Sequence, residues 1–345
     1  MGGTNGWLPS REEVLRAIRG ADRFCLTTHE RPDGDAVGSL AAMQQVLASL
    51  GKDAVAFLPA DEFPLPYEYR FIKLEGLATE PPADLCSRTL VFLDCGNIDR
   101  TLLTQQLRRD ERSGDERSAR GRGGAQILNI DHHHDNTRFG TINHVDPHSS
   151  CTAEMVWDLM KGLGVEPTKE IAEALYVGVV TDTGRFMYEN TGPRAHEMAA
   201  ELMEQGLDAH GIYRRLYEGI PQGKLELLAR GLSNVERFDG GLLTLTHLTR
   251  DDYRTTGADE SYSEGVVDHL RSVEGTAVAG LVRDQLSDGT PARKVSLRAT
   301  DDRIDVSRIA RAGGGGGHRR AAGFSTDLEF PELVRFLRAQ LAEQL

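Results

Sequence analysis

The segment "FCLTTHERPDGDAVGSLAAMQQVLASLG", residues 24–51, places a short apolar run, an acidic loop and a helical pattern in direct succession. Its first part, "FCLTT", is typical of a strand buried in a parallel sheet, and "AVGSLAAMQQVLASLG" indicates a helix. The runs "AVAFL" at 54–58, "TLVFLD" at 89–94 and "QILNID" at 126–131 repeat the strand pattern. Strands that alternate with helices predict an α/β fold with a doubly wound, mainly parallel sheet.

Length and composition narrow the class of protein. A chain of 345 residues is long for one hydrophobic core, so we expect two domains. The hydrophobic and charged fractions, 39% and 27%, are those of a globular protein. The net charge of −13 argues against binding of duplex DNA, because that affinity comes mainly from clustered Lys and Arg.

Neither a membrane span nor a secretory signal is recognisable, so we expect a cytoplasmic protein with no membrane partner. The four cysteines are widely spaced and form no C-x-x-C pair, which predicts reduced thiols and no zinc knuckle or redox motif.

The domain organisation follows from changes in pattern along the chain. Residues 8–195 form the predicted catalytic domain, in which 104–124, built mainly of Arg, Asp, Glu, Ser and Gly, are interpreted as a flexible insertion. Residues 196–230 are predicted to be a helical linker. New strand patterns then appear, and they predict a smaller α/β domain at 231–345.

Acidic and histidine side chains follow the predicted strands. The candidates from four separate segments are His29, Asp33 and Asp35, then Asp94, then Asp131, His132 and His133, and finally Asp182. Each residue alone has an ordinary explanation; Asp35, for example, lies where a helix N-cap is expected. Together they point to one site, because ligands of open α/β sheets bind at the carboxyl ends of the strands.

So many carboxylates need a compensating positive charge, because neighbouring acids raise one another's pKa and cannot all ionise. A divalent cation supplies that charge. Mixed carboxylate and imidazole ligands favour Mn²⁺ or a similar first-row metal, with Mg²⁺ and Co²⁺ as alternatives. Six candidate ligands favour two ions, which would activate a water molecule and stabilise an in-line phosphoryl displacement.

The pattern H-x-x-x-D-x-D, the Asp that ends a strand, the D-H-H triplet and the later "TDTGRF" resemble the DHH phosphoesterase family over nearly the whole chain. The resemblance implies two Mn²⁺ ions with six ligands: His29, Asp33, Asp35, Asp94, His132 and Asp182. The first two would hold one ion, while Asp35, His132 and Asp182 would hold the other. Asp94 would bridge both ions.

The same resemblance assigns roles around the metals. His133 would face the substrate phosphate, and Asp131 would orient a histidine, so that His133, Asp94 and Asp131 are the predicted catalytic residues. Arg185 is similar to an arginine that lies near the substrate in the family. His134 lies outside the triplet, and we interpret it as a polar loop residue.

The segment "ARAGGGGGHRRAAGF", residues 310–324, could be a flexible linker or an anion-binding turn of exposed backbone N–H groups ahead of a helix. It resembles the G-G-G-H-x-x-A-A-G signature of the DHHA1 domain, the substrate-binding partner of many DHH proteins. By that likeness, residues 315–317 (Gly315, Gly316 and Gly317) and His318 would bind a phosphate or sugar. Arg298 is similar to a family arginine that binds a phosphate.

Length and domain pair resemble the compact bacterial nanoRNase and pAp-phosphatase group of this family, the NrnA-like group. The likeness implies a Mn²⁺-dependent enzyme that cleaves short single-stranded oligoribonucleotides and dinucleotides to mononucleotides and converts 3′-phosphoadenosine 5′-phosphate (pAp) to AMP. It also suggests a homodimer and an active-site cleft between the domains. A phosphodiesterase of cyclic dinucleotides and a catalytically silent nucleotide-binding regulator are the alternatives.

Overall fold

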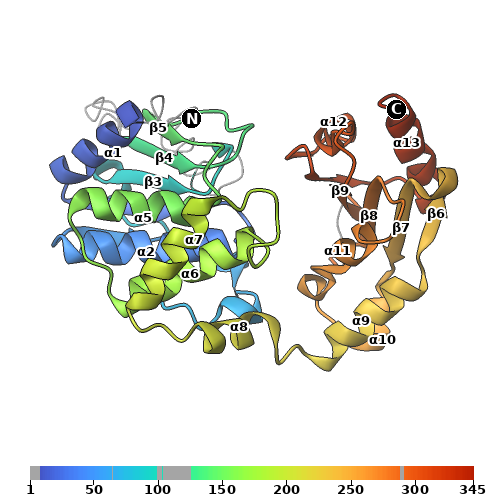
Figure 1. The fold of residues 1–345 in the computed structure, drawn as a ribbon, viewed down its shortest axis with the longest axis horizontal. Coiled ribbons are helices and arrows are strands. Elements are labelled where there is room, and N and C mark those ends of the chain that lie inside the picture. The colour runs from blue at the N-terminus through green and yellow to red at the C-terminus, as the bar shows by residue number, and fades with distance from the viewer. Residues whose placement is uncertain (1–7, 64, 99–102, 104–125, 288–290) are drawn as a thin grey trace. The chain divides into compact units, whose positions relative to one another are not determined.

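The computed structural model describes residues 8–63, 65–98, 103, 126–287 and 291–345. It divides into two compact units, Met1–Glu218 and Gly219–Leu345 (Figure 1). The predicted helical linker at 196–230 spans three helices. Two of them belong to the first unit and one belongs to the second. The predicted insertion at 104–124 lies outside the described residues.

The first unit is built on a five-stranded sheet in the order β2-β1-β3-β4-β5, in which all neighbouring strands are parallel. The strands are β1 (Arg23–Thr27), β2 (Asp53–Ala56), β3 (Thr89–Leu93), β4 (Ile127–Asp131) and β5 (Ile142–Val145). The predicted α/β class with a parallel sheet is confirmed. Strand β5 was not predicted, because "INHV" is short and half polar.

The helices of this unit are α1 (Leu8–Gly20), α2 (Gly34–Ser49), α5 (Thr152–Leu163), α6 (Lys169–Asp182), α7 (Pro193–Glu204) and α8 (Ala209–Tyr217). Side chains alternate along the buried strands, so Val91 and Leu93 belong to the core that contains these helices, whereas Leu90 and Phe92 belong to a smaller core on the other face. The parallel strands are nearly continuous apolar runs because both faces are covered.

Two glycines let α2 and α6 approach closely, as Figure 1 shows for the helices below the sheet. A Cβ atom on Gly38 would lie 2.4 Å from the carbonyl oxygen of Ala174, and one on Gly34 would lie 2.5 Å from Oγ1 of Thr181. Neither contact is sterically acceptable. The close packing brings the start of α2, with its acids, beside the end of α6.

The second unit contains a six-stranded mixed sheet in the order β10-β11-β9-β8-β7-β6. Its strands are β6 (Glu236–Phe238), β7 (Leu243–Leu248), β8 (Val278–Asp284), β9 (Arg293–Ala299), β10 (Gly316–Gly317) and β11 (Ala321–Thr326). Its helices are α9 (Gln222–Ser233), α10 (Arg250–Thr256), α11 (Val266–Arg271), α12 (Val306–Ala312) and α13 (Phe330–Ala342). Among the helices of the described residues, none has the length and apolar character needed to cross a membrane.

One buried histidine makes the stability of the first unit depend on pH. His144 in β5 is 1% exposed, and its Nδ1 lies 3.1 Å from Oγ of Ser10. Burial disfavours the charged ring and lowers the pKa of His144 to about 4. Between pH 6.5 and pH 4 the unfolded chain therefore binds a proton at this residue that the folded chain does not.

We expect acidification to destabilise the fold through His144, by about 3 kcal/mol once the pH falls from above 6.5 to about 4. The variant His144→Gln, which cannot take up this proton, should lose less stability over that range. Urea unfolding at pH 7 and pH 4.5, followed by tryptophan fluorescence, measures the difference. The exposed His148→Gln is the matched control, and an equal pH dependence in wild type and His144→Gln would contradict the assignment.

Candidate metal centre

Asp94 lies where two groups of metal-competent side chains meet. One ligand atom from each of His29, Asp33 and Asp94 lies within 4.8 Å of the others, and the same holds for Asp94, His132 and His133. Because β1, β3 and β4 are parallel neighbours, the residues that follow them gather at one edge of the sheet. The predicted convergence of these segments is what the structure shows.

Asp94 follows β3 directly and adopts a left-handed backbone conformation, with φ 55°. A non-glycine residue with positive φ is uncommon and costs conformational energy. Its carboxylate is buried, with Oδ2 at 3.5 Å from Nε2 of His29 and Oδ1 at 3.6 Å from Nε2 of His132. The two oxygens of one carboxylate thus face two different histidines.

His29 presents the correct nitrogen for a metal. Its Nδ1 lies 2.8 Å from the backbone carbonyl of Glu30, and a carbonyl oxygen only accepts hydrogen bonds, so Nδ1 carries the proton. In a neutral ring Nε2 is then unprotonated, and this is the nitrogen that faces Asp94. A backbone partner of this kind commonly fixes the tautomer of a metal-binding histidine.

Asp182 is the last residue of α6 and reaches the second group. Its Oδ2 lies 3.8 Å from Nε2 of His132 and accepts a hydrogen bond of 3.0 Å from Nδ2 of Asn190. The same amide donates to the backbone carbonyls of Ser150 and Asp182. Asn190, which the sequence analysis did not single out, therefore holds Asp182 in place.

The two acids at the start of α2 differ in their surroundings. Asp33 is the N-cap of the helix, and its Oδ1 accepts from the backbone N–H groups of Asp35 and Ala36 at 3.1 Å each. The helix begins at Gly34, two residues before the predicted start, and the cap is Asp33 rather than Asp35. Asp35 lies within the first turn, fully buried, and its carboxylate accepts from Thr152, Ala153 and Ser39.

His133, a member of the second group, forms a hydrogen-bonded pair with Asp131. Nδ1 of His133 lies 2.6 Å from Oδ1 of Asp131, which is the orienting contact expected for this acid. The other oxygen of Asp131 accepts from Nδ2 of Asn136, whose Oδ1 in turn accepts from the buried Asn129. His134 is exposed. The three consecutive histidines therefore occupy three different environments.

The carboxylates of the site are not equally ionised. Burial and the nearby charges of Asp94 and Asp182 raise the pKa of Asp35 well above its ordinary value. Burial and the charges of Asp94 and Asp33 likewise raise the pKa of Asp182. Burial acts in the same direction on Asp94, but the neighbouring rings of His29, His133 and His132 lower its pKa below the ordinary range.

The donor set fits divalent cations. The separations of 3.5–3.8 Å between histidine nitrogens and carboxylate oxygens exceed hydrogen-bond lengths. Neighbouring ligands of an octahedral ion lie about 3 Å apart, so a small contraction would place these atoms around a metal. A cation would also offset the burial and the repulsion that raise the pKa of Asp35 and of Asp182. Mixed nitrogen and oxygen donors suit Mn²⁺.

Arg185 lies in a tight turn that follows α6. It has φ 64°, and its guanidinium lies 5.0 Å from the ring centre of Tyr217, within cation–π range. The turn closes through a hydrogen bond of 2.7 Å from the backbone N–H of Arg185 to the carbonyl of Val180. Among the hydrogen bonds, ion pairs and ring contacts of the described residues, none joins Arg185 to a candidate metal ligand.

The glycine run of the second unit does not precede a helix, so the predicted helix start after it is wrong. Helix α12 ends at Ala312 with Gly313 as its C-cap, and Gly316–Gly317 form strand β10, which pairs with β11. The chain turns at Arg319 and Arg320, and the backbone N–H of His318 donates to the carbonyl of Ala321 at 2.7 Å. In β9, Arg298 pairs in register with Ala321, so it lies beside this hairpin.

Close packing explains most of these glycines. A Cβ atom on Gly315 would lie 2.1 Å from the carbonyl oxygen of Gly323, and one on Gly317 would lie 2.6 Å from Cα of Ala322. Gly316 differs, because nothing lies within 4 Å of the position of its Cβ. The packing around position 316 therefore does not require a glycine.

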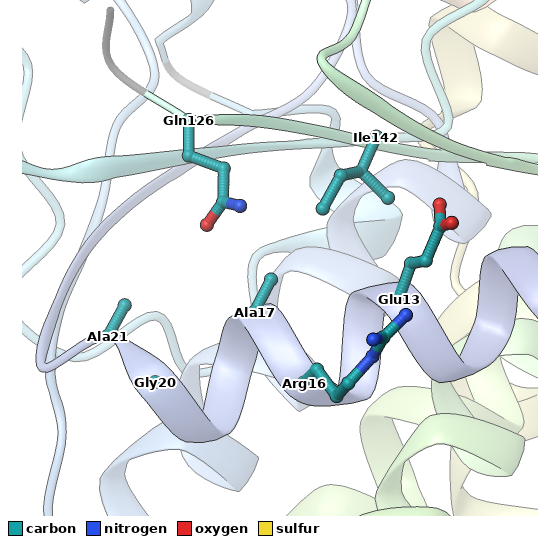
Figure 2. A pocket seen from close by; sticks show the side chains of 7 residues that line it. All are labelled: Glu13, Arg16, Ala17, Gly20, Ala21, Gln126 and Ile142. Atoms are coloured by element: carbon teal, nitrogen blue, oxygen red, sulfur yellow. The ribbon is translucent and has the colours of Figure 1, made fainter. Parts of the chain in front are cut away.

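A separate pocket of about 410 Å³ lies between α1 and the strand starts (Figure 2). Its lining residues are Glu13, Arg16, Ala17, Gly20, Ala21, Gln126 and Ile142. Ala21 and Gln126 precede β1 and β4, so the pocket lies toward the amino ends of those strands. None of the predicted site residues lines it.

Three residues near the acids were missed by the sequence analysis: Asn129, Thr152 and Asn190. Asn129 is a polar residue in an apolar strand, a signal that was available in "QILNID". The other two come from a helix start and a turn that are remote from the acids in sequence. Only the folded chain identifies them.

Comparison with known proteins agrees with this geometry. Residues 23–179 match the DHH family, N-terminal domain, and residues 252–343 match the DHHA1 domain. The chain is 36% identical over 312 residues, 90% of its length and 86% of the relative's, to the bifunctional oligoribonuclease and PAP phosphatase NrnA of Thermus thermophilus.

Two solved structures are similar in fold. An exopolyphosphatase-related protein from Bacteroides fragilis superposes with a TM-score of 0.81 at 24% identity, covering 97% of this chain and 96% of that one. RecJ from Thermus thermophilus in complex with Mn²⁺ gives a TM-score of 0.53 at 15% identity, covering 98% of this chain and 55% of that one.

Alanine substitutions at two adjacent glycines should separate packing from binding. We expect Gly315→Ala to destabilise the second unit by about 1–3 kcal/mol, because the added Cβ would clash with backbone. Gly316→Ala should leave stability unchanged, because the added methyl group would meet no protein atom. It should weaken substrate binding, because the methyl group would take up space that the substrate is expected to occupy. Urea unfolding and KM measurements test both. Unchanged KM in Gly316→Ala would remove this glycine from the proposed substrate-binding residues.

Proposed function

The chain belongs to the DHH family of phosphoesterases, and from that premise we propose that it is a Mn²⁺-dependent hydrolase of short oligoribonucleotides and of pAp. Its products would be mononucleotides from the former and AMP from the latter. The observation that carries the proposal is the position of Asp94, whose two oxygens face His29 on one side and His132 on the other. A carboxylate shared by two ligand groups suits a two-metal site.

The proposed division of the ligands between two ions is the one that the family resemblance implies. His29 and Asp33 would hold one ion, His132, Asp182 and Asp35 the other, and Asp94 both. Asp35 already accepts three hydrogen bonds, so it would coordinate through a remaining lone pair of its carboxylate. When bound, two such cations would make a water molecule nucleophilic at neutral pH and offset negative charge on the phosphate.

His133 is the residue proposed to face the phosphate. Its Nδ1 is hydrogen-bonded to Asp131. Burial alone would raise the pKa of Asp131, but the hydrogen bond and the charge of His133 lower this pKa below its ordinary value. Nε2 is thereby left for the substrate. In hydrolysis the water oxygen forms a bond to phosphorus, the ester P–O bond breaks, and the leaving oxygen takes up a proton. A histidine beside that phosphate can stabilise the developing charge.

The second unit would supply phosphate and sugar contacts through Arg298, residues 315–317 and His318. The similarity to a relative named as an oligoribonuclease and PAP phosphatase supports a substrate of this size. Holding both ends of a short nucleotide fixes the scissile phosphate, and positioning of this kind contributes strongly to the rate.

Substitution of the shared carboxylate should abolish the activity without unfolding the chain. We choose Asp94→Asn, because asparagine tolerates the positive φ that alanine would not. We expect kcat in Mn²⁺ to fall more than about 100-fold, since even outer-shell partners of metal ligands are worth 10- to 100-fold. Circular dichroism should show an intact fold. The exposed Asp135→Asn is the matched control, and full activity in Asp94→Asn would refute the site.

A substrate panel tests the specificity. Purified protein with Mn²⁺ is offered a ribodinucleotide, pAp and a cyclic dinucleotide, and the products are separated by chromatography. We expect mononucleotides from the first and AMP from the second. Chelation with EDTA should stop both reactions, and Mn²⁺ should restore them. Turnover of the cyclic dinucleotide alone would replace the proposed function with that of a cyclic-dinucleotide phosphodiesterase.

A further inference from the structure

Thr152, the first residue of α5, contacts two of the acids through two different groups. Its backbone N–H donates to Oδ2 of Asp35 at 2.7 Å, and its hydroxyl donates to Oδ1 of Asp94 at 3.0 Å. The direction of the second bond is certain, because an ionised carboxylate only accepts. Thr152 has no exposed surface, so water does not compete for either bond.

The start of α5 places Thr152 in this position. The N-cap of the helix is Cys151, whose Sγ accepts from the backbone N–H of Glu154. The next two N–H groups, of Thr152 and Ala153, have no partner inside the helix and instead donate to the two oxygens of Asp35. Asp35 thus anchors the helix, and the anchored helix carries the Thr152 hydroxyl to Asp94.

Asp94 needs a hydrogen-bond partner such as Thr152 because its carboxylate could otherwise rotate freely. The torsion that turns a carboxylate about its bond to Cβ is broad and only weakly restricted. In the structure Oδ2 faces His29 and Oδ1 faces His132, and a bridging role requires this orientation to persist. The hydroxyl of Thr152 contacts Oδ1 alone, so it restricts that rotation.

We infer that Thr152 is a positioning residue that holds Asp94 in the orientation in which each of its oxygens faces a different group of metal ligands. The inference rests on the proposed function, since it presumes that metal ions bind at Asp94. It predicts that loss of one hydroxyl group weakens metal binding and slows turnover, although Thr152 itself would touch neither metal nor substrate.

The test compares Thr152→Val, which keeps the shape and removes the hydroxyl, with Thr152→Ser, which keeps the hydroxyl. Isothermal titration with Mn²⁺ should show about 10- to 100-fold weaker binding to the valine variant, the usual effect of losing an outer-shell partner. At saturating Mn²⁺ its kcat for pAp should fall while KM stays within about twofold. The serine variant should bind Mn²⁺ and turn over pAp as the wild type does.

Thr246→Val is the matched control, because Thr246 is equally buried and its hydroxyl donates only to the carbonyl of Gly231 in the second unit. It should bind Mn²⁺ normally. If the valine variant at 152 does not fold, Thr152→Ala and Thr152→Ser repeat the comparison. Wild-type Mn²⁺ affinity and kcat in the hydroxyl-free variants would overturn the inference. A wild-type protein that binds no Mn²⁺ would instead overturn the proposed function.

Discussion

Electrostatic repulsion among buried acids is the constraint on which the site of this protein depends. Asp35 and Asp94 are almost completely buried, and together with Asp182 they crowd one edge of a parallel sheet. Burial, and then the charges of the neighbouring acids, raise the pKa of Asp35 and of Asp182. Divalent metal ions would balance this charge, and the histidines on either side of Asp94 present nitrogens suited to binding them.

The surrounding fold supplies partial compensation and fixed geometry. Peptide N–H groups at the start of α5 neutralise part of the charge on Asp35, as helix N-termini do for anions. Amide side chains perform the same task elsewhere, Asn190 on Asp182 and Asn136 on Asp131. Each of these partners also restricts the rotation of the carboxylate that it contacts. Orientation and charge compensation are therefore provided by the same hydrogen bonds.

Glycine permits close packing in both units. In the first, Gly34 and Gly38 allow α2 to approach α6, which brings the acids of two distant segments together. In the second, most glycines of the run at 313–317 permit close passage of the backbone past β11, so the run is part of a packed hairpin rather than a linker. A run of small residues has the same appearance in the sequence whether it leads into a helix or into a strand, which explains why the expected helix start was wrong.

Local pattern was sufficient for the α/β class, the parallel strands and the set of acids and histidines that gather at their ends. Strand periodicity and the common polarity of parallel strands place those residues at one edge whatever the rest of the chain does. The individual environments of the histidines, the hydrogen bonds of Asp35, and the contacts of Thr152 and Asn190 depended on the folded chain. They join residues up to 118 positions apart. No local pattern encodes such a contact, because it arises only where helices from distant parts of the chain pack together.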